Sequence, residues 1–203
     1  MKQLIALAAL LALSACGSNY KLVDSDRRAI GKAYSVEPQI TWSTFSVTVP
    51  AGDEMKERNV TTGNQYQIWT VDGTKLQALY LYQGLGEGAA LFPGQGLEKQ
   101  EFPTFRGDMR APEIVEFVED SIGRLGNTQV TAQNLRPAAF GSLPGFRFEL
   151  TYLSPTGLER ESTALGVVNA GVLYLILYDG ASHYYYPKYR DQVERIFSSI
   201  QVI

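Results

Sequence analysis

One histidine and one cysteine are the residues of this chain best suited to nucleophilic or metal chemistry. His183 and Cys16 are the only members of their types among the 203 residues. Zinc and copper sites usually need several histidine or cysteine ligands, which this chain cannot supply by itself. A Ser-His-Asp triad would require His183, yet no serine lies in the Gly-x-Ser-x-Gly pattern of a nucleophile elbow. We therefore expect no catalytic residue, no metal and no cofactor.

Two other patterns invite a catalytic or nucleotide-binding interpretation. The run Gly84-Leu85-Gly86-Glu87-Gly88 lacks the third glycine of a dinucleotide fingerprint at the required Gly-x-Gly-x-x-Gly spacing. It also lacks the Lys-Ser/Thr ending of a P-loop. Glu113, Glu116, Glu119 and Asp120 could form the carboxylate pair that glycoside hydrolases use. They fall on the polar side of an expected helix, and a solvated charged face accounts for them. A hydrolase is therefore the least favoured of three functional hypotheses.

The start of the chain has the pattern of an export signal. Lys2 is followed by an apolar run from Leu4 to Leu13. About ten residues span only about 15 Å as a helix, half of the hydrocarbon core, so the run is typical of a signal peptide rather than a permanent span.

The apolar run ends in Leu13-Ser14-Ala15-Cys16-Gly17, which resembles the bacterial lipobox. The resemblance implies that Cys16 receives diacylglycerol and that a signal peptidase removes residues 1–15. Two or three acyl chains would hold the mature protein stably at a membrane. Gly17, where inner-membrane lipoproteins have Asp, implies sorting to the outer membrane, facing the periplasm.

The composition argues against nucleic acid as a partner and for one folded domain. The formal net charge is −3, and Arg27-Arg28 is the only basic doublet. Apolar residues make up 45% of the chain, including 12 Tyr and 9 Phe, which is enough for a sizeable core. We predict a signal peptide over residues 1–15, a lipidated tether over 16–35 and a single domain over 36–203.

Hydrophobic periodicity predicts the elements of that domain. A hairpin over residues 65–82 turns at Asp72-Gly73, and a long glycine-rich loop then runs to about residue 110. A helix is expected from Ala111 to about Leu125, and a second helix begins at Pro187. The remaining expected strands cover 20–23, 40–49, 129–136, 146–152, 158–168 and 172–178. The last of these is apolar throughout and reads as a central strand that Asp179-Gly180 ends.

The order of these elements predicts an α+β fold, with an antiparallel sheet of about seven or eight strands and two main helices packed on it. This order, with Phe197-Ser198-Ser199-Ile200 at the end of the closing helix, is similar to the PsbP-like sandwich fold over residues 40–203. The resemblance implies an assembly or binding role without a shared catalytic motif.

The candidate binding surface combines aromatic and glycine residues. His183, Tyr184, Tyr185 and Tyr186 are four consecutive rings at a turn, and they cannot all point into one core. Tyrosine is a preferred residue at contact surfaces. We expect this cluster and the loop that holds Gly84, Gly86 and Gly88 to line the same edge of the domain. The alternative is that alternate rings pack beneath the closing helix.

Two further functional hypotheses follow from this fold. In the first, the chain is a non-enzymatic, lipid-anchored envelope protein that binds a protein partner or assists assembly of an envelope complex. In the second, it is a carrier that holds a lipid or other apolar ligand in a cavity between sheet and helices. Ligand extracted with the purified domain would favour the carrier, whereas a co-purified envelope protein would favour the first hypothesis.

Overall fold

The computed structural model describes residues 21–22, 28–30, 33–37, 43–47, 66–93 and 102–203. Its main sheet is antiparallel and has eight strands in the order β1-β4-β5-β6-β10-β9-β8-β7. These are β1 (Lys21–Leu22), β4 (Ser43–Val47), β5 (Tyr66–Thr70), β6 (Gln77–Leu85), β7 (Thr128–Phe140), β8 (Leu143–Leu153), β9 (Glu159–Asn169) and β10 (Val172–Ala181). A three-stranded sheet consists of β2 (Arg28–Ile30), β3 (Tyr34–Val36) and β11 (Gln201–Val202). Among the described residues there are two helices, α2 (Ala111–Gly123) and α3 (Tyr185–Ser198).

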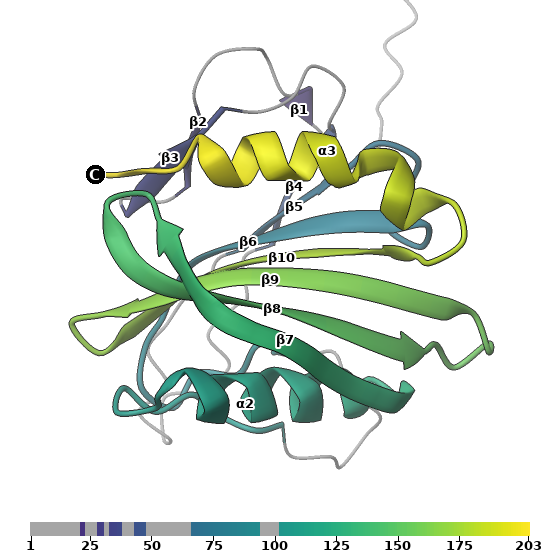
Figure 1. Ribbon diagram of the computed structural model, residues 1–203, viewed down its shortest axis with the longest axis horizontal. Helices are drawn as coiled ribbons and strands as arrows, with labels where there is room; N and C mark the ends of the chain where they lie inside the picture. Colours follow the sequence, from purple (N-terminus) through teal and green to yellow (C-terminus); the bar gives the residue numbers. More distant parts are fainter. Residues whose placement is uncertain (1–20, 23–27, 31–32, 38–42, 48–65, 94–101) are drawn as a thin grey trace, which may run out of the picture.

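The two helices cover opposite faces of the main sheet (Figure 1). Alternation along the central strands builds a separate core on each face. Leu79, Leu81 and Ile176 belong to the core under α3. Tyr82 and Leu175 belong to the core under α2. The predicted α+β class, with two helices packed on an antiparallel sheet, is confirmed.

Local contacts fix both ends of α2 and the last turn of α3. Pro112 lies in the first turn of α2, and the Glu113 carboxylate accepts a hydrogen bond from the Arg110 backbone N–H at 2.8 Å. Gly126, with φ of +86°, follows the helix where the chain reverses. At the end of α3, Ser199 Oγ accepts a hydrogen bond from the Glu37 backbone N–H at 2.8 Å, and Ile200 is buried. This bond ties the end of α3 to the strand β3 segment.

The predicted boundary at residue 36 is too late, because folded strands lie within the predicted tether. Ile30 and Tyr34 are buried in the core under α3. The Tyr34 hydroxyl donates a hydrogen bond to the Tyr82 carbonyl oxygen at 3.0 Å. Strands of three residues carry too little periodicity to be recognised in a sequence, which explains the error. Cys16 and the signal segment lie outside the described residues.

The strands expected over residues 129–136 and 146–152 are too short, because β7 and β8 extend through the intervening residues and turn at Gly141, where φ is +58°. Pro137 pairs with Phe146 in the ladder and is tolerated because β7 is the edge strand.

Candidate functional site

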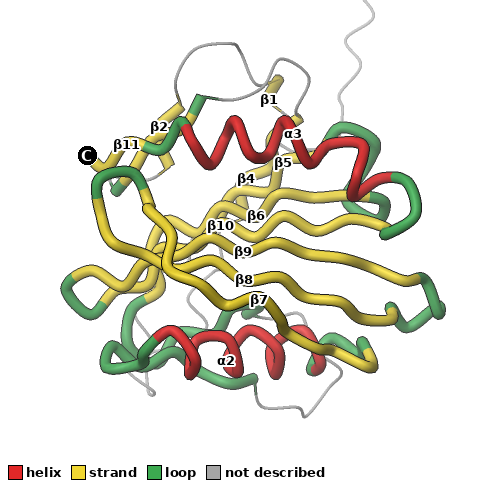
Figure 2. Tube along the Cα trace, in the orientation of Figure 1, coloured by secondary structure: helices red, strands yellow, loops and turns green. Residues whose placement is uncertain are grey.

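The His183–Tyr186 segment connects β10 to α3 at one end of the sheet, where Figure 2 shows a short turn leading into the helix. Its four rings divide between solvent and core. The side chain of His183 is 87% exposed and lies 3.4 Å from the Glu159 carboxylate. Tyr184 is 59% exposed, Tyr185 is half-buried and Tyr186 is only 7% exposed. The segment therefore exposes two rings, His183 and Tyr184, exposes Tyr185 in part and buries Tyr186.

Tyr186 is a core residue. Its hydroxyl lies 2.5 Å from Thr163 Oγ1, and its ring stacks on Tyr178 with ring centroids 5.2 Å apart. The Tyr178 hydroxyl donates to the backbone carbonyls of Tyr185 and Tyr186 at 2.9 and 3.0 Å. These bonds hold the first turn of α3 against β10, so the neighbouring exposed rings are presented from a rigid base.

Three tyrosine rings surround a lysine: Tyr184 is exposed, Tyr185 is half-buried and Tyr189 is buried. We call the group formed with the lysine and its carboxylate partner the Tyr–Lys patch: Asp72, Tyr184, Tyr185, Lys188 and Tyr189. The Lys188 ammonium lies 5.3 Å from the ring centroid of Tyr184, 5.7 Å from that of Tyr185 and 4.8 Å from that of Tyr189. All three distances are within the range of cation–π attraction. The ammonium also lies 3.0 Å from Asp72 Oδ2, and the Tyr189 hydroxyl donates to the same oxygen. The patch thus joins the β5–β6 turn to the start of α3.

The charges in the patch stabilise one another. The hydrogen bond from Tyr189 lowers the pKa of Asp72, and Lys188 lowers it further. Hydrogen bonds to Tyr189 and Asp72 raise the pKa of Lys188 above its ordinary value. Both groups are therefore ionised at neutral pH. The patch presents a fixed ion pair framed by aromatic rings, an arrangement suited to contact with another molecule rather than to proton transfer.

The glycine half of the predicted surface lies elsewhere, which corrects the expectation that Gly84, Gly86 and Gly88 share an edge with the tyrosines. Leu85 pairs with Leu173 at the start of β10, whereas the tyrosines follow the end of β10. Figure 2 shows these two connections at opposite ends of the sheet. Gly84 lies inside β6 with φ of +137°, where a Cβ would come within 3.1 Å of Tyr174 and Val172. The Gly88 N–H donates to the Phe105 carbonyl at 2.8 Å. These two glycines serve the local backbone.

A buried ionic network near the tyrosines was not foreseen. Asp179 was expected to end the central strand, but it lies inside β10 opposite Ser162 and Ala78. Its carboxylate accepts hydrogen bonds from the Tyr152 hydroxyl at 2.6 Å and the Ser162 hydroxyl at 3.0 Å. Arg160 Nε donates to Oδ2 at 3.0 Å, and Arg160 Nη2 also donates to that oxygen. In the sequence, this network could have been inferred from an acidic residue next to an apolar strand and a basic residue in the preceding strand.

The network is built to stay charged. Burial alone would lower the pKa of Arg160, but the hydrogen bonds and charge of Asp179 raise it. Burial also raises the pKa of Tyr152, and Asp179 adds to the increase. Arg160 Nη1 donates to the Lys75 carbonyl at 2.8 Å, so the network also fixes the turn before β6. A hollow of about 290 Å³ beside it is lined by Arg160, His183 and other mostly polar residues.

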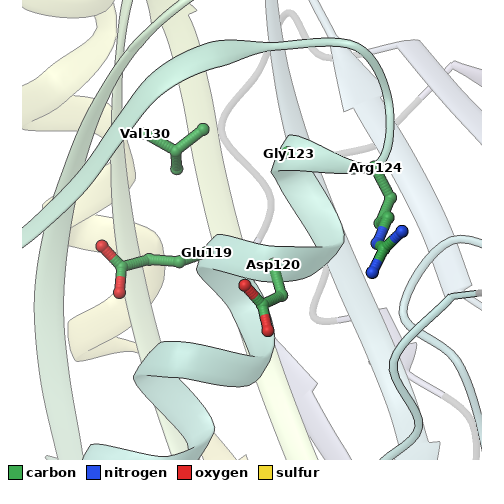
Figure 3. Close-up of a pocket in the computed structure, with 5 residues that line it drawn as sticks. All are labelled: Glu119, Asp120, Gly123, Arg124 and Val130. Atoms are coloured by element: carbon green, nitrogen blue, oxygen red, sulfur yellow. The ribbon is translucent and has the colours of Figure 1, made fainter.

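The acidic face of α2 borders a separate hollow of about 480 Å³ next to Val130 of β7. Figure 3 shows the side chains of Glu119, Asp120 and Arg124 pointing in different directions. Glu119 Oε1 accepts a hydrogen bond from the Ala132 backbone N–H at 2.6 Å. The two carboxylates do not converge on a common point, as the pair in a glycoside hydrolase must.

The described ranges hold no group of three or more His, Cys, Asp or Glu side chains placed to bind a metal ion. No helix among the described residues has both the length and the apolar character needed to cross a bilayer.

Comparison with known proteins identifies the fold. No protein-family model matches the chain, and no curated protein is significantly similar to it in sequence. The structure is similar to the solution structure of cyanobacterial PsbP (CyanoP) from Synechocystis sp. PCC 6803. The TM-score is 0.50 at 13% identity, and the match covers 94% of this chain and 99% of that chain. LpqN, described as involved in cell envelope biogenesis of Mycobacterium tuberculosis, matches with a TM-score of 0.40 at 10% identity over 83% of this chain and 82% of its own. The likeness to CyanoP shows that the chain has the PsbP-like fold predicted from its element order.

Proposed function

We propose that this chain is a lipid-anchored protein of the bacterial envelope whose domain binds a protein partner through the Tyr–Lys patch and catalyses no reaction. The observation that carries the proposal is the patch itself. Tyr184 is 59% exposed, although it is a large aromatic residue on a turn held by buried hydrogen bonds. A rigid, exposed tyrosine beside a fixed cation is typical of residues that dominate binding energy at protein interfaces.

The absence of convergent catalytic groups among the described residues agrees with a binding role. In the buried Arg160–Asp179 ion pair, both carboxylate oxygens are occupied by hydrogen bonds within the protein. Such a pair preserves the shape of the sheet end that carries the patch.

The anchoring part of the proposal depends on Cys16, in the pattern Leu-Ser-Ala-Cys. Cells that express the wild-type chain and a Cys16→Ser variant should be labelled with radioactive palmitate. We expect label and membrane fractionation only in the wild type. A Cys16→Ser variant that still carries label would refute the anchoring proposal. Density fractionation of the two membranes then tests the outer-membrane location implied by Gly17.

Partner binding can be tested by placing a photo-crosslinking amino acid at position 184 of the full chain in its own envelope. Gln133, an exposed residue on the edge strand β7, provides the matched control position. We expect a discrete adduct from position 184 that is absent from position 133. The adduct should decrease when Lys188→Gln removes the cation. If both positions give the same adducts, or position 184 gives none, the patch is not a partner-binding surface.

A further inference from the structure

A third hollow, of about 460 Å³, lies where α2 begins and strands β7, β8 and β9 approach it. It is at the opposite end of the sheet from the Tyr–Lys patch, since Val168 of β9 pairs with Leu173 at the start of β10. Its size falls within the range of small-molecule sites. Its apolar lining residues are Met109, Ala111, Ile114, Leu135, Pro137, Pro144, Phe146 and Val168.

Leu135 is presented to this hollow by a break in the sheet. The β7–β8 register shifts between Gln133 and Arg136, and Asn134 has a positive φ of 57°. Such bulges redirect side chains at sheet edges. Leu135 is consequently 41% exposed on a strand whose regular geometry has been interrupted. The bulge gives the hollow an apolar rim in addition to its apolar floor.

The charge of the hollow is positive. Arg110 and Arg136 are the two charged residues that line it. Arg136 pairs with Glu149 at 3.2 Å, while no carboxylate in the described part of the chain forms an ion pair with the Arg110 guanidinium. The positive end of the α2 dipole adds to the potential at Ala111, the first residue of the helix. Charge complementarity therefore favours an anionic occupant.

The walls favour an acyl chain over a peptide. A peptide that adds to the edge strand β7 would need a continuous row of backbone donors and acceptors. The row is interrupted by register shifts between Thr128 and Thr131 and between Gln133 and Arg136, and Pro137 has no N–H. An acyl chain needs no hydrogen-bond partner along its length, so these interruptions cost it nothing.

We propose that this hollow binds a long-chain fatty acid, whose acyl chain lies against Leu135, Ile114 and Phe146 and whose carboxylate is held by Arg110 and Arg136. The site is independent of the proposed partner-binding function, because it is formed by different elements at the other end of the sheet.

The test uses the full chain in membranes and a palmitate analogue that carries a photoactivatable diazirine. After irradiation, the labelled peptides are mapped by mass spectrometry. We expect label in the segments 109–114 and 135–146. Unmodified palmitate should compete for labelling, whereas hexadecanol, which has the same chain length without the carboxylate, should compete about tenfold less well because it has no negative charge to pair with the two arginines.

Matched variants separate the site from general surface effects. Leu135→Glu and Arg110→Ala should each reduce labelling by about tenfold. Leu158→Glu changes another leucine of similar exposure, 39%, and Arg124→Ala changes an exposed arginine beyond the other end of α2. Both controls should label like the wild type, and all four variants should keep its melting temperature.

Three results would overturn the proposal. These are labelling that maps elsewhere, labelling that survives Leu135→Glu, and competition by hexadecanol equal to that by palmitate. If a variant loses its melting transition, the comparison of palmitate with hexadecanol on the wild-type chain still shows whether the hollow recognises the carboxylate.

Discussion

At the scale of single residues, the Arg160–Asp179 pair holds two opposite charges in the interior of a sheet. Arg160 is 8% exposed and Asp179 is 5% exposed. We predict that Asp179→Ala destabilises the fold by about 3–5 kcal/mol, because it leaves the Arg160 charge buried without its partner. Denaturant unfolding of the purified chain measures this loss.

The double variant Asp179→Leu with Arg160→Met is the control for that prediction. It removes both charges and keeps the volume apolar, so most of the lost free energy of unfolding should return. If the double variant is as unstable as Asp179→Ala, shape rather than charge pairing explains the effect.

The tyrosines of the segment before α3 should differ sharply in their effects on stability. Tyr186→Ala removes a packed ring with its bond to Thr163, and we expect a loss of about 3–5 kcal/mol. Tyr184→Ala removes an exposed ring and should change the free energy of unfolding by less than about 0.5 kcal/mol. Thermal melts of the two variants check both values, and equal losses would contradict the assignment of Tyr184 to the surface.

Part of this residue-level pattern could be predicted from the sequence. The excess of rings at 183–186 indicated that some must be exposed, but not which one. That choice depends on Tyr178 of β10, whose hydroxyl fixes the helix start and directs Tyr186 inward. The ionic network was missed because Asp179-Gly180 is a common turn pair, and only the pairing with β9 places Asp179 beside Ser162 and Arg160.

At the scale of elements, glycine sets how closely β8 approaches β9. A Cβ on Gly145 would collide with the backbone carbonyl oxygen of Gly166. We predict that Gly145→Ala destabilises the fold by about 1–3 kcal/mol through overpacking. Gly123→Ala is the matched control, because no atom lies within 4 Å of its added Cβ and the residue is helical. It should stabilise the chain by up to about 1 kcal/mol. Chemical denaturation of both variants distinguishes close packing from a general effect of alanine.

Long elements with regularly spaced apolar residues could be predicted from the sequence, and short elements could not. The stripe of α2 includes Ile114, Phe117 and Ile122, all buried, and it was evident from spacing alone. Strands β2 and β3 have three residues each, and the third strand of their sheet, β11, comes from a segment far along the chain. Pairing over such a separation leaves no local sequence signal.

At the scale of the whole molecule, buried tyrosines make the fold sensitive to alkali. Burial raises the pKa of Tyr34, Tyr80, Tyr82, Tyr152 and Tyr178 above the ordinary value near 10. Their stabilising contribution is complete below about pH 10, where tyrosines of the unfolded chain are also protonated. Above that pH the unfolded chain loses protons that the folded chain keeps, so stability decreases by up to about 1.4 kcal/mol per pH unit for each tyrosine.

Alkaline titration tests this expectation by following phenolate absorbance and far-ultraviolet circular dichroism together. A cooperative absorbance step that coincides with loss of the dichroism signal is expected for the buried rings. Gradual ionisation of every tyrosine while the dichroism signal persists would contradict it.

The fold class was predictable at this scale, but the placement of the candidate surface was not. Loops after β6 and after β10 could leave the sheet at the same end or at opposite ends, depending on strand pairing. The two strands pair antiparallel, with Gln77 opposite Gly180, and this places the loops at opposite ends. Two distinct surfaces therefore exist where the sequence predicted one.

The pairing of β3 with β11 has a consequence for the order of folding. Residues 201–202 pair with Tyr34 and Ser35 across most of the described chain, so the small sheet is complete only when these two distant segments meet. Until then, Ile200 and the end of α3 have no partner strand to cover them. Contacts that join the two ends of a chain also form slowly, because the whole intervening loop must close first. The small sheet is therefore expected to close late in folding, after the hairpins of the main sheet, whose strands are near in sequence.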